Sequence, residues 1–249
     1  MKNLLFVFSL LLVLAGQRAW ACEQCKKYND ADFQITAASI THHKSLGVLV
    51  WEIQVKGQAG KTQPTPVGRL NGAPVLGYVF PTTLKAKDIG FNQTEGIVAM
   101  ALTSHPDFDD TPLWDENNDQ RYDNDGIIWH AHWVLLVEDK RVPGGLAVKE
   151  HKKGDASVRK PKTAPNMAMY MDSPNFNIVT EGNAIRVVIP TSRINGQTSF
   201  GFDAVGAYME VSTGEKGGHE GGTKPMLGVY KVYSVLSGDL SLPYKVKAI

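Results

Sequence analysis

The chain has 249 residues, of which 43% are hydrophobic and 20% are charged. This balance is typical of a globular protein with a sizeable core, and it excludes a disordered chain, which would combine low hydrophobicity with high net charge. The 26 basic residues nearly balance the 25 acidic ones, which argues against a nucleic-acid partner or an anionic membrane surface. The two cysteines exclude a disulfide framework and a zinc site of four thiolates.

The first 21 residues have the pattern of an export signal. A positively charged start precedes an apolar stretch over residues 4–15, and the sequence AWA at 19–21 has small residues where signal peptidase cleaves. The apolar stretch is shorter than the roughly 20 residues of a membrane span, and no later segment resembles one. We therefore expect a cleaved signal peptide over residues 1–21, a periplasmic location and a single domain over 22–249. Lipid attachment at Cys22 is the alternative.

The mature chain would begin with Cys22 and Cys25. In an oxidising compartment this pair predicts a small disulfide at the N-terminus. Because no strand precedes the pair and no His follows it, neither a redox motif nor a haem attachment site is indicated. A role as acceptor of a soft metal ion is the alternative.

From residue 33 onward the pattern is that of β-structure. Alternating or β-branched segments are separated by clusters of Gly, Pro, Asn and Asp, and no long amphipathic helix is evident. The predicted strands cover residues 33–40, 47–55, 75–80, 97–104, 127–138, 184–189, 200–211 and 228–234. An acidic loop over 106–126 and a basic, Gly- and Pro-rich loop over 140–163 interrupt them. These features predict an all-β fold, a single-domain sandwich or barrel.

The segment WHAHW at 129–133 carries the clearest functional signal. Side chains alternate along a strand, so His130 and His132 point to one face with Cα atoms about 6–7 Å apart, close enough for two imidazoles to share one ion. The flanking residues are large and apolar, which predicts a strand buried on both faces. Two buried imidazoles need partners to offset desolvation, and a metal ion is the simplest common partner. Two histidines on a solvated face are the alternative.

Further ligands are sought among the remaining histidines and carboxylates. His105 ends the predicted strand 97–104, and an antiparallel pairing with strand 127–138 would bring it near His130, so we expect it as the third ligand. Asp203 interrupts the apolar run FGFDAVGAY, where a carboxylate needs a partner, and it is the expected oxygen ligand. The remaining histidines look less suitable, because at most one of an adjacent pair can face the ion and the others lie in loops: His42, His43, His151 and His219.

The acidic loop also invites a calcium interpretation, because residues 107–125 hold eight acidic side chains. Asp115, Asn117 and Asp119 match the first ligand positions of an EF-hand, but Gln120 and Gly126 stand where that motif needs Gly and Glu. An EF-hand is therefore excluded. A different calcium site, a solvated loop and a lid beside the histidines stay open.

The histidine segment resembles the first motif of the cupin superfamily, in which a Gly, His-x-His, a Glu and a second Gly follow in order. Here Gly126, His130, His132, Glu138 and Gly145 keep this order with different intervals. Six strand steps place Glu138 about 20 Å from His132, so the family's glutamate ligand is not carried over to it. The second cupin motif, a Pro-x-Gly followed by His, is absent downstream.

The segments LNGAPVLGYVFPTTL, TSHPDFDDTPLWDE and GIIWHAHWVLLVED resemble more closely the periplasmic copper-binding cupins of cyanobacteria, over about residues 33–190. The resemblance implies a jelly-roll sandwich and a soluble copper(II) protein with a tryptophan near its metal, by position Trp129 or Trp133. Exported imidazole ligands also suit Cu2+ on chemical grounds, with Zn2+ as the competing ion.

We therefore predict an exported copper(II)-binding protein that stores copper or receives exported copper. A copper-dependent oxidoreductase with an open coordination position is the alternative from another class, and it would need a water-filled position and a pocket. A metal-free exported binding domain is the third interpretation.

Overall fold

The computed structural model describes residues 22–111, 115–121, 125–214 and 223–249. The predicted signal peptide, including the AWA sequence at 19–21, lies outside the described residues, as does His219. In the described ranges, no helix has the length and apolar character needed to cross a membrane.

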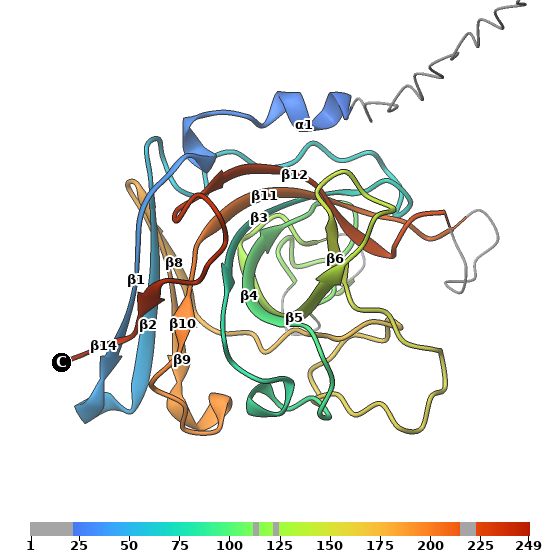
Figure 1. Ribbon diagram of the computed structural model, residues 1–249. Coiled ribbons are helices and arrows are strands. Elements are labelled where there is room, and N and C mark those ends of the chain that lie inside the picture. Colours follow the sequence, from blue (N-terminus) through green and yellow to red (C-terminus); the bar gives the residue numbers. More distant parts are fainter. Residues whose placement is uncertain (1–21, 112–114, 122–124, 215–222) are drawn as a thin grey trace, which may run out of the picture.

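Two sheets make up most of the fold (Figure 1). One is a five-stranded sheet in the order β14-β1-β2-β9-β8, and the other is a seven-stranded sheet in the order β4-β3-β11-β12-β6-β5-β7. An additional pairing of β4 with β5 closes six strands of the larger sheet into a barrel. The prediction of an all-β sandwich or barrel is confirmed.

The strands of the five-stranded sheet are β1 (Ile35–His43), β2 (Val48–Val55), β8 (Ile178–Glu181), β9 (Ala184–Pro190) and β14 (Lys247–Ala248). Those of the larger sheet are β3 (Pro74–Pro81), β4 (Ile97–Ser104), β5 (His130–Glu138), β6 (Leu146–Val148), β7 (Met171–Asp172), β11 (Val205–Val211) and β12 (Leu227–Val235). A small pair is formed by β10 (Gly201–Phe202) and β13 (Tyr244–Lys245). Among the described residues, one helix, α1 (Glu23–Lys27), and four short 3-10 turns complete the set, the turns at Ala31–Phe33, Lys44–Leu46, Ala86–Ile89 and Thr191–Ile194.

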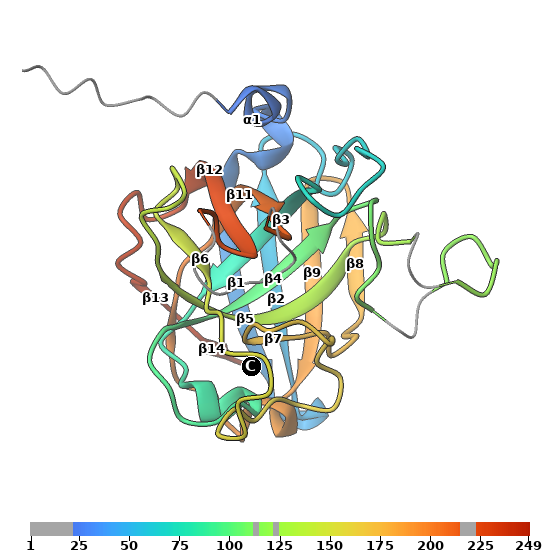
Figure 2. The same ribbon diagram turned by 90° about the vertical axis from the view of Figure 1, so that its right-hand side faces the viewer.

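The five-stranded sheet packs against one side of the barrel, and β4 and β5 run obliquely across it (Figure 2). Strand β2 of the five-stranded sheet explains this packing. Every second residue of β2 is buried, and this alternation turns Trp51 toward the barrel. There Trp51 packs edge-on against Trp133 of β5, with ring centroids 5.7 Å apart. This aromatic core between the sheets is one of two separate hydrophobic clusters.

The second cluster fills the barrel itself and consists of small and medium side chains, chiefly Val, Ala and Met. Strand β5 contributes to both clusters, with Trp133 between the sheets and Val134 in the barrel. The expected burial of this strand on both faces is confirmed for its first seven residues. Alternation therefore places His130 and His132 on the face of Val134, inside the barrel.

The predicted strands are present, and their boundaries differ from the prediction by at most three residues. Residues 200–211 are the exception, because they form two strands, β10 and β11, in place of one. This break lies at Asp203, whose backbone N–H donates to the carbonyl of Pro81. The sequence did not predict five short strands, because two to four residues are too short to show a period: β6, β7, β8, β13 and β14. At the N-terminus, Cys22 and Cys25 form a disulfide, and Cys22 caps α1.

Candidate metal centre

Antiparallel pairing of β4 and β5 brings three histidines to one end of the barrel. Thr103 lies opposite His130 in the ladder, and Ala101 lies opposite His132. His105 follows the end of β4 directly, and its Nε2 lies 2.8 Å from Nε2 of His130. The expected proximity of His105 to His130 is therefore confirmed.

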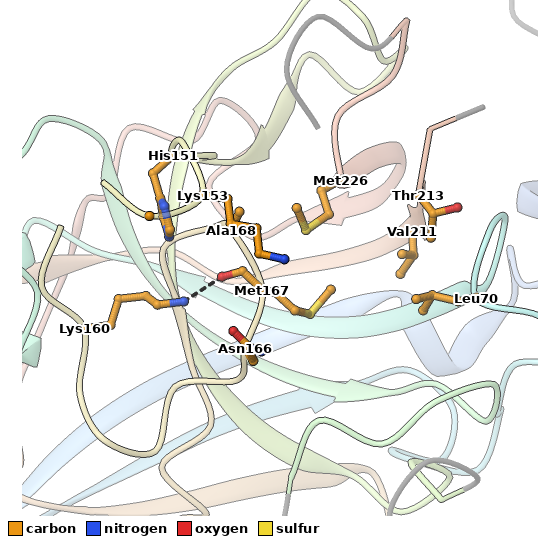
Figure 3. Close-up of a pocket in the computed structure, with 11 residues that line it drawn as sticks. Leu70, His151, Lys153, Lys160, Asn166, Met167, Ala168, Val211, Thr213 and Met226 are labelled. Atoms are coloured by element: carbon orange, nitrogen blue, oxygen red, sulfur yellow. Dashed lines mark hydrogen bonds between the residues drawn. The ribbon is translucent and has the colours of Figure 1, made fainter. Parts of the chain in front are cut away.

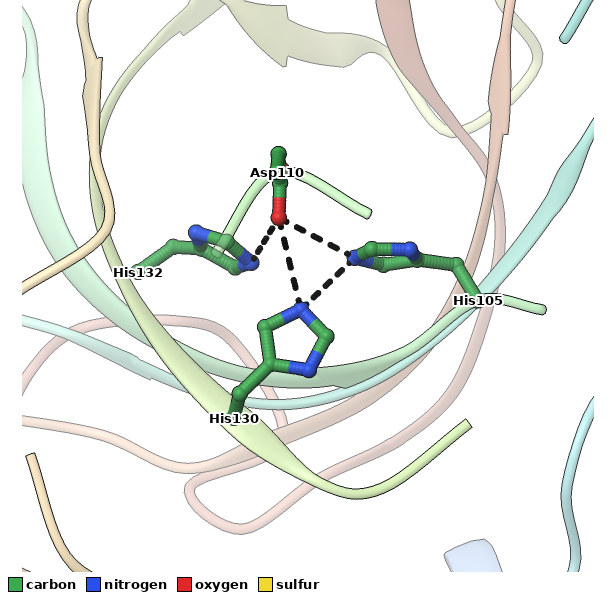
Figure 4. Close-up of side chains that lie close together, drawn as sticks. All are labelled: His105, Asp110, His130 and His132. Carbon is green, nitrogen blue, oxygen red and sulfur yellow. Dashed lines mark hydrogen bonds and ion pairs between the residues drawn. The ribbon is translucent and has the colours of Figure 1, made fainter. Parts of the chain in front are cut away.

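The acidic loop supplies the fourth group. Oδ1 of Asp110 lies 3.4 Å from Nε2 of His130, 3.4 Å from Nε2 of His132 and 3.6 Å from Nε2 of His105. All four ligand atoms lie within 4.8 Å of one another, and the side chains are between 2% and 6% exposed. Figure 4 shows the three imidazoles arranged around this single carboxylate oxygen.

Each imidazole is held through its other ring nitrogen. Nδ1 of His105 donates to the carbonyl of Phe108 over 2.9 Å, and Nδ1 of His130 donates to the carbonyl of Ile128 over 2.7 Å. Nδ1 of His132 lies 3.0 Å from the hydroxyl oxygen of Ser173. A proton on Nδ1 leaves the lone pair of the neutral ring on Nε2, so the lone pairs of His105 and His130 face Asp110. For His132 the Ser173 hydroxyl can donate or accept, and the backbone of Asp172 favours the proton that gives the same arrangement. Such outer partners are typical of histidines that ligate metals.

Two lone pairs 2.8 Å apart repel unless a cation or a proton lies between them. His105 and His130 are in this position when both rings are neutral. Nε2 of His132 is also buried without a hydrogen-bond partner. Both observations point to a positive charge at the centre of the cluster.

The electrostatics without an ion lead to the same conclusion. Burial lowers the pKa of His105 to about 4 and that of His132 to about 3, and Asp110 offsets this only in part. Burial also opposes a charge on His130, but the hydrogen bond to Asp110 outweighs it and raises that pKa. Burial raises the pKa of the Asp110 carboxyl as well, yet the three imidazoles lower it below its usual range. Without an ion, the surroundings thus favour the anionic form of Asp110 and favour a proton on His130 over one on His105 or His132.

The distances between Asp110 and the imidazoles fit a metal ion, whereas the Nε2 atoms of His105 and His130, 2.8 Å apart, are closer together than a bound ion would hold them. A tetrahedral ion with bonds of about 2.0–2.1 Å holds its ligand atoms about 3.3–3.4 Å apart. The three separations between Asp110 and the imidazoles, 3.4, 3.4 and 3.6 Å, are close to this value. Buried His105, His130, His132 and Asp110 are therefore placed to bind a metal ion.

The acidic loop closes on the cluster at Gly126. The N–H of His105 donates to the carbonyl of Gly126 over 2.7 Å. Gly126 has φ +104°, and a Cβ atom there would lie 2.3 Å from the carbonyl oxygen of His105. Only glycine tolerates this approach. Part of the loop thus lies beside the histidines, one of the arrangements that the sequence had left open.

Other carboxylates of this loop hold its backbone. Asp115 accepts hydrogen bonds from the N–H groups of Asp119 and Gln120. Glu116 accepts from the N–H groups of Ile127 and Ile128. These contacts hold the conformation of the loop. They do not test calcium binding, which stays a prediction.

Asp203, the expected oxygen ligand, is not brought to this cluster. It follows β10, next to Pro81 at the far end of β3, and it is fully buried. Its carboxylate accepts from the Ser237 hydroxyl and from the N–H of Ala204, which satisfies it without an ion. Asp110, and not Asp203, supplies the carboxylate oxygen of the cluster.

The remaining candidates also lie apart from the cluster. Glu138 ends β5, six residues beyond His132, as its strand position had implied. Trp129, which directly precedes β5, and Trp133 of β5 lie in the core between the sheets, on the side opposite His130. Trp129 donates its indole N–H to the carbonyl of Gly60 over 2.9 Å.

Comparison with known proteins adds no relative: no family model matches the chain, and no curated protein or solved structure shows a significant match. The fold and the cluster alone define its class, an all-β protein with a buried cluster of three histidines and one aspartate that is placed to bind a metal ion.

Proposed function

We propose that this chain is an exported copper(II)-binding protein related to the cyanobacterial periplasmic copper-binding cupins. The observation that carries the proposal is the convergence of three imidazole Nε2 atoms on one carboxylate oxygen of Asp110. A His-x-His strand inside a barrel and the three resembling segments support the relationship. The role that fits such a binding protein is to store copper or to receive exported copper.

The donor set favours copper(II) over most competing ions. Three imidazoles and one carboxylate offer nitrogen and oxygen ligands of intermediate softness, and the affinity order of divalent ions places copper above zinc, nickel and cobalt. The only two cysteines of the chain form a disulfide, so no thiolate competes for the ion. Zn2+ fits the same ligands and is the main competitor.

The size of the space beside the cluster favours binding over turnover. The cavity that His105, Asp110 and His132 share has a volume of about 20 Å³, whereas sites for small organic molecules measure about 300–1,000 Å³. It admits a species of the size of water and no organic substrate. The copper-dependent oxidoreductase considered from the sequence therefore has less support.

The test is a titration with Cu(II) against a competing chelator. We expect one Cu(II) per chain in the wild type, and a loss of affinity of at least about 1,000-fold in the double variant His130→Ala/His132→Ala, because two of four ligands are removed. The matched control, His42→Ala/His43→Ala, removes two histidines of β1 and should bind like the wild type. Retained binding by the first variant, with circular dichroism still showing β-structure, would refute the assignment.

Export is tested separately. Expression of the full chain in a Gram-negative bacterium should yield periplasmic protein that begins at Cys22. A cytoplasmic protein that keeps residues 1–21 would contradict the proposed location.

A further inference from the structure

Methionines are concentrated in the barrel. Of the seven methionines in the chain, Met1 is not among the residues that the structure describes, and Met100 belongs to the core between the sheets. The other five belong to the barrel cluster or pack against it: Met167, Met169, Met171, Met209 and Met226. Their neighbours there are mainly Val, Ala and Leu, so the thioethers are the most polarisable groups of an otherwise aliphatic interior.

Three of these methionines line the cavity beside the metal centre. Met167, Met169 and Met171 alternate along one segment, and all three share the cavity with His105, Asp110 and His132. Met169 is fully buried, and Met171 is 2% exposed. Imidazole, carboxylate and thioether groups thus line the same cavity.

The position of Met171 follows from the register of β7. Met171 pairs with Val134 of β5, two residues beyond His132 and on the same face of the strand. Ser173, two residues after Met171, holds Nδ1 of His132. One short segment therefore supplies both a partner of a ligating histidine and the thioether wall.

The cavity has room for a single ion. Its volume of about 20 Å³ matches the roughly 10–15 Å³ or more that one water-sized species needs. A larger pocket of about 430 Å³ lies outward of it and shares Met167 and Val211 with the inner cavity. Figure 3 shows the thioether side chains of Met167 and Met226 reaching into this outer pocket. The thioether of Met167 thus lines both the outer pocket and the cavity beside the metal centre.

Methionine often serves only to fill gaps in a core, and leucine would fill the same volume. Beside the histidine and aspartate cluster, the sulfur atoms can also act as metal ligands. Thioethers are soft ligands that select Cu(I), whereas imidazoles with a carboxylate suit Cu(II).

We propose that the methionine-lined cavity is a second metal site, in which Met167, Met169 and Met171 bind Cu(I) next to the three-histidine centre. This proposal rests on the proposed function, because it takes copper to be the metal that the protein binds. The two sites would allow the protein to take up copper in either oxidation state as it is supplied. The histidine centre binds Cu(II), and the thioether cavity binds Cu(I).

The test compares Cu(I) and Cu(II) affinities of matched variants under anaerobic conditions. In Met169→Leu/Met171→Leu, which nearly conserves volume, we expect the affinity for Cu(I), measured against a chromophoric chelator, to fall about 100-fold, and that for Cu(II) to change less than about threefold. The control is Met100→Leu, a fully buried methionine of β4 that belongs to the other core cluster. It should match the wild type for both ions. Ag(I), which undergoes no oxidation in air, should follow the same order.

X-ray absorption of the wild type loaded with Cu(I) gives a second measurement that needs no variant. We expect sulfur scatterers in the first coordination sphere, and their loss or reduction in Met167→Leu, a half-buried position that tolerates change. A spectrum with nitrogen ligands alone, absence of Cu(I) binding by the wild type, or unchanged Cu(I) affinity in the double variant would overturn the proposal. Failure of the wild type to bind Cu(II) would instead overturn the proposed function, so the two failures are distinguishable.

Discussion

Gly126 lies against His105 so closely that its carbonyl accepts the His105 N–H over 2.7 Å. A Cβ atom at Gly126 would be 2.8 Å from the His105 ring nitrogen Nδ1. This contact joins the end of the acidic loop to its beginning, just where Asp110 must be held over the histidines. The metal centre therefore depends on a residue that offers no ligand.

Gly126→Ala tests this dependence. We expect a loss of at least about 2 kcal/mol in the free energy of unfolding and at least a tenfold loss of copper affinity, because the new Cβ atom collides with His105. Denaturant unfolding and chelator competition measure the two effects. Gly154→Ala is the matched control: Gly154 also has a positive φ, +82°, but has nothing within 4 Å of its Cβ position. Equal behaviour of the two variants would show that the contact is unimportant.

Asp110→Asn keeps the shape of the side chain and removes its charge. We expect copper affinity to fall by about 10–100-fold, and the pKa of His130 to fall as well, because the Asp110 carboxylate is what raises it against burial. Chelator competition and NMR titration of the imidazole ring measure the two quantities. The comparison variant Asp109→Asn lies outside the cluster and keeps an oxygen to accept the N–H of Thr111. Because Asp109 also raises the pKa of His130, but less than Asp110 does, this variant should lower that pKa by a smaller amount. A pKa of His130 that does not change would contradict our assignment of the charges.

Ser173→Ala removes the hydroxyl partner of His132 and no ligand. We expect about a tenfold loss of copper affinity, at the lower end for outer partners, because the backbone carbonyl of Asp172 still favours a proton on His132. Ser157→Ala, in an exposed turn with Asp155, serves as the control. Affinity equal to that of the wild type would mean that Ser173 does not orient the ring.

The stability of the metal-free protein should fall in weak acid. His105 and His132 have an ordinary pKa of 6.5 that burial lowers to about 4 and about 3. Below pH 6.5 the unfolded chain therefore binds more protons at these positions, and the free energy of unfolding decreases as the pH falls toward 4. The raised pKa of His130 acts in the opposite sense only above pH 6.5, so its contribution is already complete in this window. The pKa of Asp109, which burial raises to about 6, also acts in the opposite sense and offsets part of the decline below pH 6. Urea unfolding between pH 7.5 and 4.5 should show this decline, and a weaker one in His132→Ala. A flat profile would contradict it.

Much of the metal centre could be predicted from the period of a strand. Alternation alone placed His130 and His132 on one face, and the order of two strands along the chain placed His105 beside them. These relationships are local or follow from one antiparallel pairing, so a sequence can express them.

The carboxylate could not be predicted in this way. Asp110 is one of eight acidic residues in an irregular loop, and no period distinguishes it from Asp107 or Asp109. Its role depends on how the loop closes, which the contact of Gly126 with His105 determines in three dimensions. Asp203 drew attention because a buried carboxylate needs a partner, and the structure gives it Ser237. The need was inferred correctly, but a hydroxyl group meets it.

Electron paramagnetic resonance of the chain loaded with one equivalent of Cu(II) tests the central claim most directly. The four-residue cluster predicts a single copper species with hyperfine structure from three imidazole nitrogens, and the loss of this species in His130→Ala/His132→Ala. A signal from free or heterogeneous copper in the wild type, or an unchanged spectrum in the double variant, would contradict a copper site built from His105, Asp110, His130 and His132.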